Sequence, residues 1–136
     1  MSGPWRASMR DSVTCNPCLA LYGLRLKEAS DGAINGAVAL VFTFKHDATS
    51  GAGRVHGVRR GDTVDVVFLP TVADEVHQTR AGGIKGVLAP DGSSIHGEVW
   101  FTLPDSISRE YRRPIILVRA ELDSALLAIL SEAKLR

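Results

Sequence analysis

The fold is decided by the stretch Ile34-Asn35-Gly36-Ala37-Val38-Ala39-Leu40-Val41-Phe42. It begins with a β-branched residue, a polar residue and glycine, and it continues in apolar residues. The same three-residue step recurs at Val55-His56-Gly57, Ile84-Lys85-Gly86 and Ile95-His96-Gly97. Glycine inside a strand marks a bend, a bulge or a close approach of two backbones. The repeat therefore predicts a twisted antiparallel sheet that curls on itself.

Turn residues divide the chain into short runs. Ser30-Asp31-Gly32, Arg60-Gly61-Asp62 and Pro90-Asp91-Gly92 each separate two runs of strand-forming residues, and this arrangement favours hairpins. We interpret Thr49–Gly53 as a polar loop, and Trp5–Val13 is a candidate for an additional strand. The seven strands that we expect with more support are Leu24–Lys27, Ala33–Phe44, Arg54–Val58, Thr63–Leu69, Gly83–Leu88, Ser94–Leu103 and Pro114–Glu121.

The last part of the chain changes its period. Apolar residues from Leu122 to Ala133 recur at spacings near 3.6, with Asp123 at the start and Lys134 near the end. This pattern predicts a helix over about 122–135, after strands over about 20–121. No linker divides residues 1–136, so we expect a single all-β domain. Its architecture is an antiparallel up-and-down β-barrel of seven or eight strands with one C-terminal helix; a two-sheet sandwich is the alternative.

This order of short meandering strands resembles the small up-and-down barrels of the lipocalin and avidin kind, over about residues 20 to 121. Several tryptophans line avidin-like pockets, whereas this chain has only Trp5 and Trp100. The lipocalin Gly-x-Trp step is matched only by Gly3-Pro4-Trp5, at the end of the chain. The resemblance therefore implies a calycin-like architecture and assigns a function to no residue.

Charge and hydropathy exclude some partners. The chain has 16 basic and 15 acidic residues, whereas a surface that follows phosphates needs a basic excess or a basic stripe. We therefore do not expect nucleic acid as a partner. The longest strongly apolar stretch, Ala37–Phe44, is far shorter than the roughly 20 residues of a spanning helix, so we expect no membrane partner. No basic start followed by an apolar block opens the sequence, which favours a cytoplasmic location.

The two cysteines, Cys15 and Cys18, lie three residues apart. A zinc site needs a second pair or two suitably spaced histidines, and the sequence has neither. A redox dithiol belongs between a strand and a helix, whereas this chain consists mainly of strand patterns. We expect no metal and no cofactor, and the sequence leaves open whether the cysteines are inert, structural or redox-active.

Alternation along the strands separates two faces of the predicted sheet. One face is apolar almost throughout and should form the core. The opposite face is mixed, and a face open to water would be more polar. We therefore expect the helix or a partner subunit to cover part of it, and the second possibility predicts a homo-oligomer. The polar residues of this mixed face are Asn35, His56, Asp65, Lys85, His96 and Glu98.

These polar residues are the candidate site. A histidine oriented by a carboxylate can act as acid or base near neutral pH, so the candidate catalytic residues are His56, Asp65, His96 and Glu98. The residues that directly precede the four glycines are the candidate ligand-binding residues, namely Asn35, His56, Lys85 and His96. The alternative is that all of them are solvated residues on the outside of the sheet.

Two further segments are candidates for binding. The loop Pro70–Gly82 is long enough to be a lid or to plug one end of a barrel. The run Arg109–Arg113 contains three arginines that could hold a phosphate or a carboxylate, unless it is a solvated loop.

No catalytic motif names a reaction. The sequence lacks a Gly-x-Ser-x-Gly elbow, a dinucleotide fingerprint and a His-Glu-x-x-His motif. We expect a barrel that binds a small hydrophobic or amphipathic molecule, with acid–base chemistry of the isomerase or cyclase kind as an extension. The reason is that glycines on the inner face would leave room for a ligand. The alternative is a non-catalytic oligomeric accessory subunit. The role of the polar residues depends on which face is inside.

Overall fold

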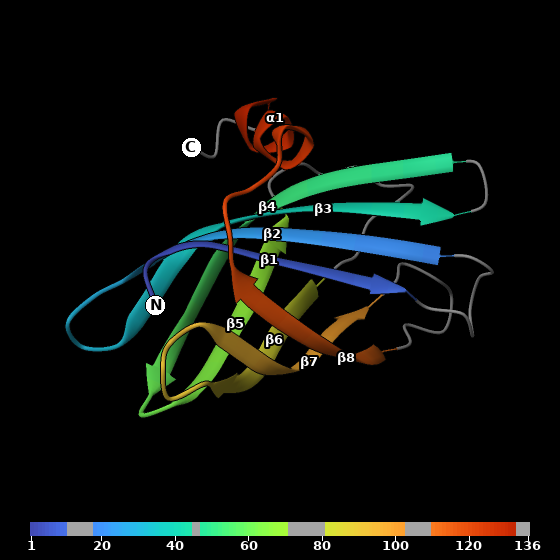
Figure 1. Ribbon diagram of the computed structural model, residues 1–136. Helices are drawn as coiled ribbons and strands as arrows, with labels where there is room; N and C mark the ends of the chain where they lie inside the picture. Colours follow the sequence, from blue (N-terminus) through green and yellow to red (C-terminus); the bar gives the residue numbers. More distant parts are fainter. Residues whose placement is uncertain (11–17, 45–46, 71–80, 103–109, 133–136) are drawn as a thin grey trace.

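A computed structural model describes residues 1–10, 18–44, 47–70, 81–102 and 110–132 (Figure 1). These residues form a closed barrel in which each strand pairs with its neighbours in the sequence and β1 pairs with β8. The predicted barrel and C-terminal helix are confirmed, and the additional strand near the N-terminus is present. The elements are β1 (Gly3–Arg10), β2 (Cys18–Glu28), β3 (Ala33–Phe44), β4 (Asp47–Arg60), β5 (Thr63–Pro70), β6 (Ala81–Leu88), β7 (Ser94–Thr102), β8 (Glu110–Arg119) and α1 (Ser124–Glu132).

Three tight turns close one end of the barrel, which we call the turn end. Gly32, Gly61 and Gly92 have φ values of 89°, 62° and 74°, so each occupies the left-handed region that favours glycine. Asp31 and Asp91 each accept a hydrogen bond of 3.0 Å from the backbone N–H two residues later. The three hairpin predictions are therefore confirmed. The opposite end, where β1 ends and β2 begins, is the far end.

Strands β2 and β4 extend furthest beyond the ranges that the sequence predicts. Thr49–Gly53 is part of β4, so the prediction of a loop there was wrong. Its serine and glycines favour turns, but pairing with β3 satisfies the backbone, as in the pairs Leu40↔Gly51 and Val38↔Gly53. Strand β2 begins at Cys18 instead of Leu24 for the same reason, since both β1 and β3 pair with it.

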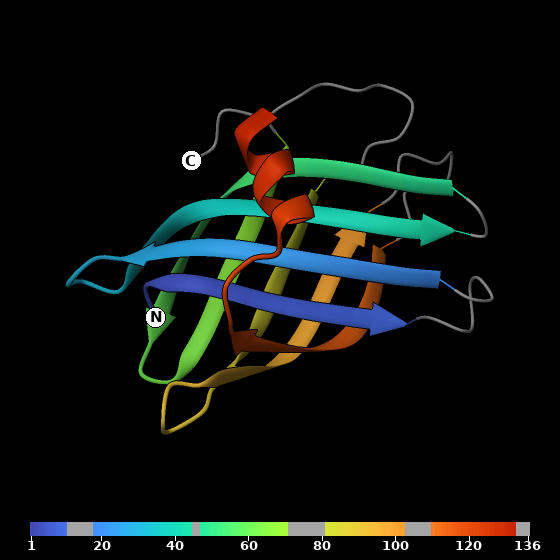
Figure 2. The ribbon, with the colours of Figure 1, turned by 45° about the horizontal axis from the view of Figure 1, so that its top comes forward.

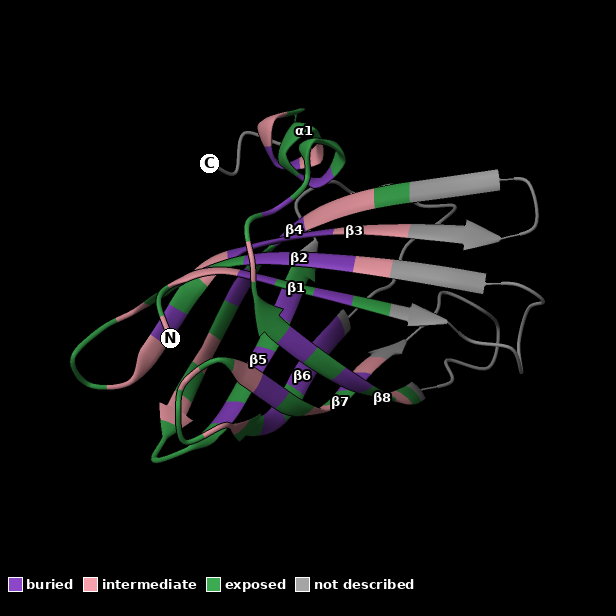
Figure 3. Ribbon diagram, in the orientation of Figure 1, coloured by how far each residue is buried: buried purple, intermediate pink, exposed green. Residues whose placement is uncertain are grey.

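The apolar face of the sheet lies inside the barrel. Side chains from all eight strands form one buried cluster, with bulky members such as Trp5, Leu24 and Ile34 at exposures of 0–1%. The residues between them point outward, which gives the alternating pattern of buried and exposed positions in Figure 3. The polar residues of the mixed face therefore lie on the exterior.

The glycines of the four repeated steps do not open space in this core. A Cβ at Gly36 or Gly97 would overlap a carbonyl oxygen of the neighbouring strand, that of Arg25 or Lys85 respectively. Gly57 and Gly86 would meet neighbouring carbonyl oxygens in the same way. The interpretation that these glycines leave room for a ligand was therefore wrong. Their role is to let strongly curved strands approach each other closely.

The two halves of the barrel, β1–β4 and β5–β8, have the same internal pairing. Residue numbers in β5 and β7 exceed those of their counterparts in β1 and β3 by 61, and numbers in β6 and β8 exceed those in β2 and β4 by 60. With these shifts, Leu26↔Gly36 corresponds to Gly86↔Gly97. The barrel is thus built from two half-barrels in matching register.

The helix packs outside the first half. Figure 2 shows α1 lying across the outer side of β3 and β4. Its Leu126 and Leu130 are buried together with Leu122, against Ala37 and Ala39. Small side chains let the helix approach: a Cβ at Gly23 would lie 2.8 Å from Leu126 Cδ1. The expectation that the helix covers part of the mixed face is met on this side of the barrel.

Candidate functional site

The residues predicted from the sequence form separate groups on the exterior. Asn35 Oδ1 lies 2.8 Å from His56 Nδ1, across the pair β3–β4. His96 lies on β7, with β5 and β6 between it and β4, and its Nε2 is 3.2 Å from Ser94 Oγ. In the described part of the chain neither histidine hydrogen-bonds to a carboxylate. The two histidines therefore do not converge on one site.

The charged residues of this face form a row. Asp65, Lys85 and Glu98 lie directly opposite one another on β5, β6 and β7. All three are exposed, and neither Asp65 nor Glu98 forms an ion pair with Lys85. The row places alternating charges on the outer surface, away from the buried core.

Several other sequence predictions concern residues outside the described ranges. Cys15, most of the loop Pro70–Gly82 and Arg109 are in this category, whereas Cys18 begins β2. Within the described ranges, no group of three or more histidines, cysteines or acidic residues is placed to hold a metal ion. The helix within the described residues is not long and apolar enough to cross a membrane.

Arg119 closes the turn end of the barrel wall. Strands β1 and β8 pair only at Trp5↔Arg119 and Arg6↔Val118. The Arg119 guanidinium lies 4.7 Å from the centre of a Trp5 ring, and Nη1 donates a 2.8 Å hydrogen bond to the carbonyl of Ser2. Its Nε donates to the carbonyl of Gly92, 2.9 Å away in the β6–β7 turn. The Arg119 side chain thus links β1 and β8, which meet at the seam of the barrel, to the β6–β7 turn.

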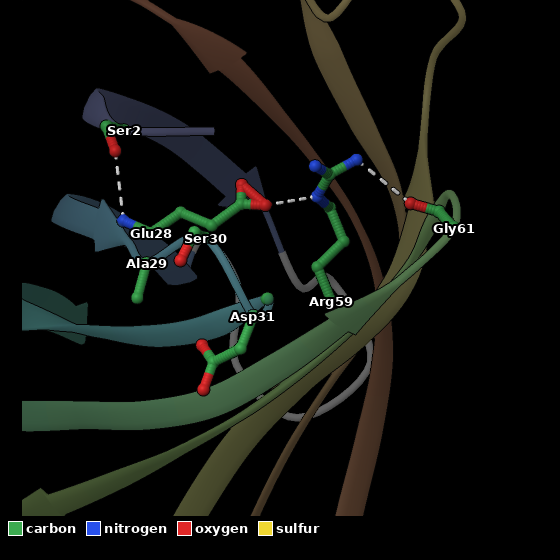
Figure 4. Close-up of a pocket in the computed structure, with 8 residues that line it drawn as sticks. Ser2, Glu28, Ala29, Ser30, Asp31, Arg59 and Gly61 are labelled. Carbon is green, nitrogen blue, oxygen red and sulfur yellow. Dashed lines mark hydrogen bonds and ion pairs between the residues drawn. The ribbon is translucent and has the colours of Figure 1, made fainter.

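Glu28 and Arg59 cover the core at the same end. They occupy inward-facing positions of β2 and β4, and their side chains form an ion pair (Figure 4). Arg59 Nη1 also donates a 3.0 Å hydrogen bond to the Gly61 carbonyl. The pair borders an open depression of about 500 Å³ that lies outside the filled core. Its lining residues are Ser2, Glu28, Ala29, Ser30, Asp31, Gly32, Arg59 and Gly61.

The inside of the barrel becomes accessible toward the far end. Inward-facing Ile34 and Leu117, near the turns, are about 1% exposed, whereas Leu40, Gly51 and Arg113 are partly exposed. Gly51 differs from the four repeat glycines, because the nearest described atom to a Cβ there would be Leu40 Cδ1 at 4.0 Å. Figure 3 shows the change from buried to intermediate along β3 and β4. Among the described inward-facing residues, apolar side chains near the turns are therefore buried, whereas Leu40, Gly51 and Arg113 toward the far end are partly exposed.

Arg113 brings a positive charge to this part of the lumen. Ile115 and Leu117 of β8 are buried inside, so alternation gives Arg113 an inward-facing position. Its Nη1 donates a 2.7 Å hydrogen bond to the Arg112 carbonyl. The sequence predicts that the last strand begins at Pro114, whereas β8 begins at Glu110. The alternation of Ile115 and Leu117 includes Arg113 only if the strand extends back past Pro114.

Tyr22 adds a neutral polar group to the lumen. It lies opposite Leu40 and is buried, and this burial raises the pKa of the phenol to about 12. The hydroxyl therefore stays protonated at any physiological pH. Tyr22 and Arg113 are thus one neutral and one cationic group among the described inward-facing residues.

Comparison of this chain with protein-family models, curated proteins and solved structures found no match.

Proposed function

We propose that this protein binds a small, mainly apolar molecule with a negatively charged group, in the far half of the barrel lumen. The single observation that carries the proposal is the change from buried apolar side chains near the turns, such as Ile34 and Leu117, to partly exposed Leu40, Gly51 and Arg113 toward the far end. Ligand sites are usually apolar cavities with a few polar groups that fix the orientation of the ligand. The ligand would enter from the far end, because Glu28, Arg59 and Arg119 cover the other.

Arg113 is the residue that we assign to the charged group. A guanidinium carries five N–H donors in a planar fork that matches the two oxygens of a carboxylate. The proposal concerns binding and not turnover. Among inward-facing positions whose side chains are described, Glu28 is the only carboxylate and it is paired with Arg59, while His56 and His96 lie outside.

Binding of decanoate and of decanol tests this proposal. Both have the same apolar chain, and only decanoate is charged. We expect Arg113→Gln to weaken decanoate binding by roughly 10- to 100-fold and to leave decanol binding nearly unchanged, because hydrogen bonds to charged groups contribute about 1.5–3 kcal/mol. Displacement of a fluorescent apolar probe measures both affinities.

Arg112→Gln is the matched control, since Arg112 is the neighbouring residue and points outward. It should not change either affinity. Equal losses in the two variants, or no binding of either compound by the wild-type protein, would overturn the proposal.

The second candidate function is that of a non-catalytic oligomeric accessory subunit. The observation that favours it is the set of exposed aliphatic side chains on the outside of the second half-barrel, which includes Val67, Val87 and Ile116. The size of the protein in solution tests this function, because a protein that buries such a surface against another subunit should not be strictly monomeric.

A further inference from the structure

We propose that the exterior of β5–β8 docks a second copy of this chain and forms a weak, two-fold symmetric dimer. This face is the outer side of the second half-barrel, whereas α1 packs on the outer side of the first. No described element covers it, and it exposes large aliphatic side chains: Ile116 is 54% exposed, Val87 49% and Val118 43%. Exposed apolar groups within a polar frame are typical of interaction surfaces.

The charged row identifies the partner. Asp65, Lys85 and Glu98 alternate in sign across three neighbouring strands. Lys85 makes no ion pair with either carboxylate within its own chain. A row of alternating charge is complementary to a copy of itself shifted by one strand. A second copy of the same surface can therefore pair Lys85 of each copy with Glu98 of the other, without a partner of another kind.

Symmetry then fixes the arrangement. In a two-fold dimer, residue i contacts residue j of the other copy and residue j contacts residue i. An axis that lies in the interface, parallel to the strands and between β6 and β7, exchanges these two strands. It places Lys85 against Glu98 of the second copy, and the reverse contact forms as well. An axis across the strands along this row would instead place Lys85 against itself, so the charges select the first axis.

The shape of the face permits close approach. Trp100 lies directly opposite Gly83, and a Cβ at Gly83 would be only 2.7 Å from Trp100 Nε1. The indole therefore lies over the glycine and does not project from the sheet. With strands about 4.8 Å apart and outward residues about 6.7 Å apart along each strand, the face covers roughly 400 Å² per copy, which is typical of weak complexes.

Sedimentation velocity over a concentration series, up to about 500 µM to suit a weak complex, tests the dimer. Wild-type protein should associate as concentration rises. Lys85→Glu and Glu98→Lys should each lower the association constant at least about tenfold, because each places like charges opposite each other twice. An equimolar mixture of the two variants should associate again, since position 85 of one then meets position 98 of the other with opposite charge.

The mixture separates an effect between copies from an effect within one chain. If the substitutions acted only by disturbing their own barrel, mixing would rescue nothing. Lys27→Glu is the control, because Lys27 is an exposed lysine on β2, in the other half-barrel, and its change should leave association unaltered. A wild-type protein that stays monomeric at the highest concentration would overturn the proposal. So would a dimer that both single variants preserve, or a mixture that fails to associate.

Discussion

The two half-barrels share their pairing register but differ in what fills a hollow on their outer side. In the first half, Gly23 lies opposite Ala39, and these small residues receive Leu122 and Leu126 of the helix segment. In the second half, the counterparts are Gly83 and Trp100, and the indole fills the hollow itself. The comparison teaches that one backbone position, an outward glycine, serves two purposes. It admits a helix where its neighbour is small, and it seats an aromatic ring where its neighbour is large.

The largest effect should come from the two equivalent inward glycines. Gly36→Ala and Gly97→Ala would each drive a Cβ into a carbonyl oxygen, that of Arg25 or Lys85. We expect each to lower the free energy of unfolding by about 3 kcal/mol or more, measured by urea denaturation, because backbone cannot move aside as a side chain can. Gly51→Ala is the matched control and should change stability by less than about 1 kcal/mol, since the nearest described atom to its Cβ would be Leu40 Cδ1 at the ordinary contact distance of 4.0 Å. If Gly97→Ala left the stability unchanged while Gly36→Ala lowered it strongly, the two half-barrels would not be equivalent.

A smaller effect should separate the two ways of filling the outer hollow. Leu126 is fully buried between helix and sheet, so we expect Leu126→Ala to cost about 2–4 kcal/mol. Trp100 is only partly buried, and Trp100→Ala should cost less, about 1–2 kcal/mol, because part of the ring already contacts water. Urea denaturation of both variants measures the difference. If Trp100→Ala destabilised the protein more than Leu126→Ala, the indole would contribute more to stability than the packing of the helix.

The smallest effect at neutral pH concerns Tyr22, whose counterpart in the second half is Gly82. Burial raises the pKa of Tyr22 to about 12, above the value of 10.0 that it has when unfolded. The folded state therefore disfavours the phenolate. Stability should be level below pH 10 and should fall as the pH rises from 10 toward 12, where the unfolded chain ionises first. Ultraviolet titration of a Tyr111→Phe variant, which leaves one tyrosine, checks this; a midpoint near 10 without unfolding would contradict it.

The sequence carried most of the information about the fold, because barrel formation depends on local signals. Glycine beside aspartate in the turns, alternation along the strands and the change of period after residue 121 each have a local physical cause. The errors fell where pairing overrides local preference. Thr49–Gly53 has the composition of a loop, yet β3 on one side holds it in β4.

The candidate site was harder to predict, because it depends on register and on which face is inside. His56 and His96 share a face, as alternation indicates, but two strands separate them, and a single sequence gives no register for strands that are not joined by a tight turn. Arg113 lies within the charged run Arg109–Arg113, which the sequence pattern alone does not place on a strand. Its position became informative only when β8 was seen to begin at Glu110, which places Arg113 in line with Ile115 and Leu117.

The narrow seam between β1 and β8 has a consequence for the order of folding. Every other strand pair joins neighbours in the sequence, whereas the Arg119–Ser2 hydrogen bond spans 117 positions and the seam has only two residue pairs. Closing so long a loop costs entropy before the few contacts of the seam can compensate for it. The hairpins should therefore form first, as an open curved sheet, and the stacking of Arg119 on Trp5 should be the last step, the one that turns this sheet into a barrel.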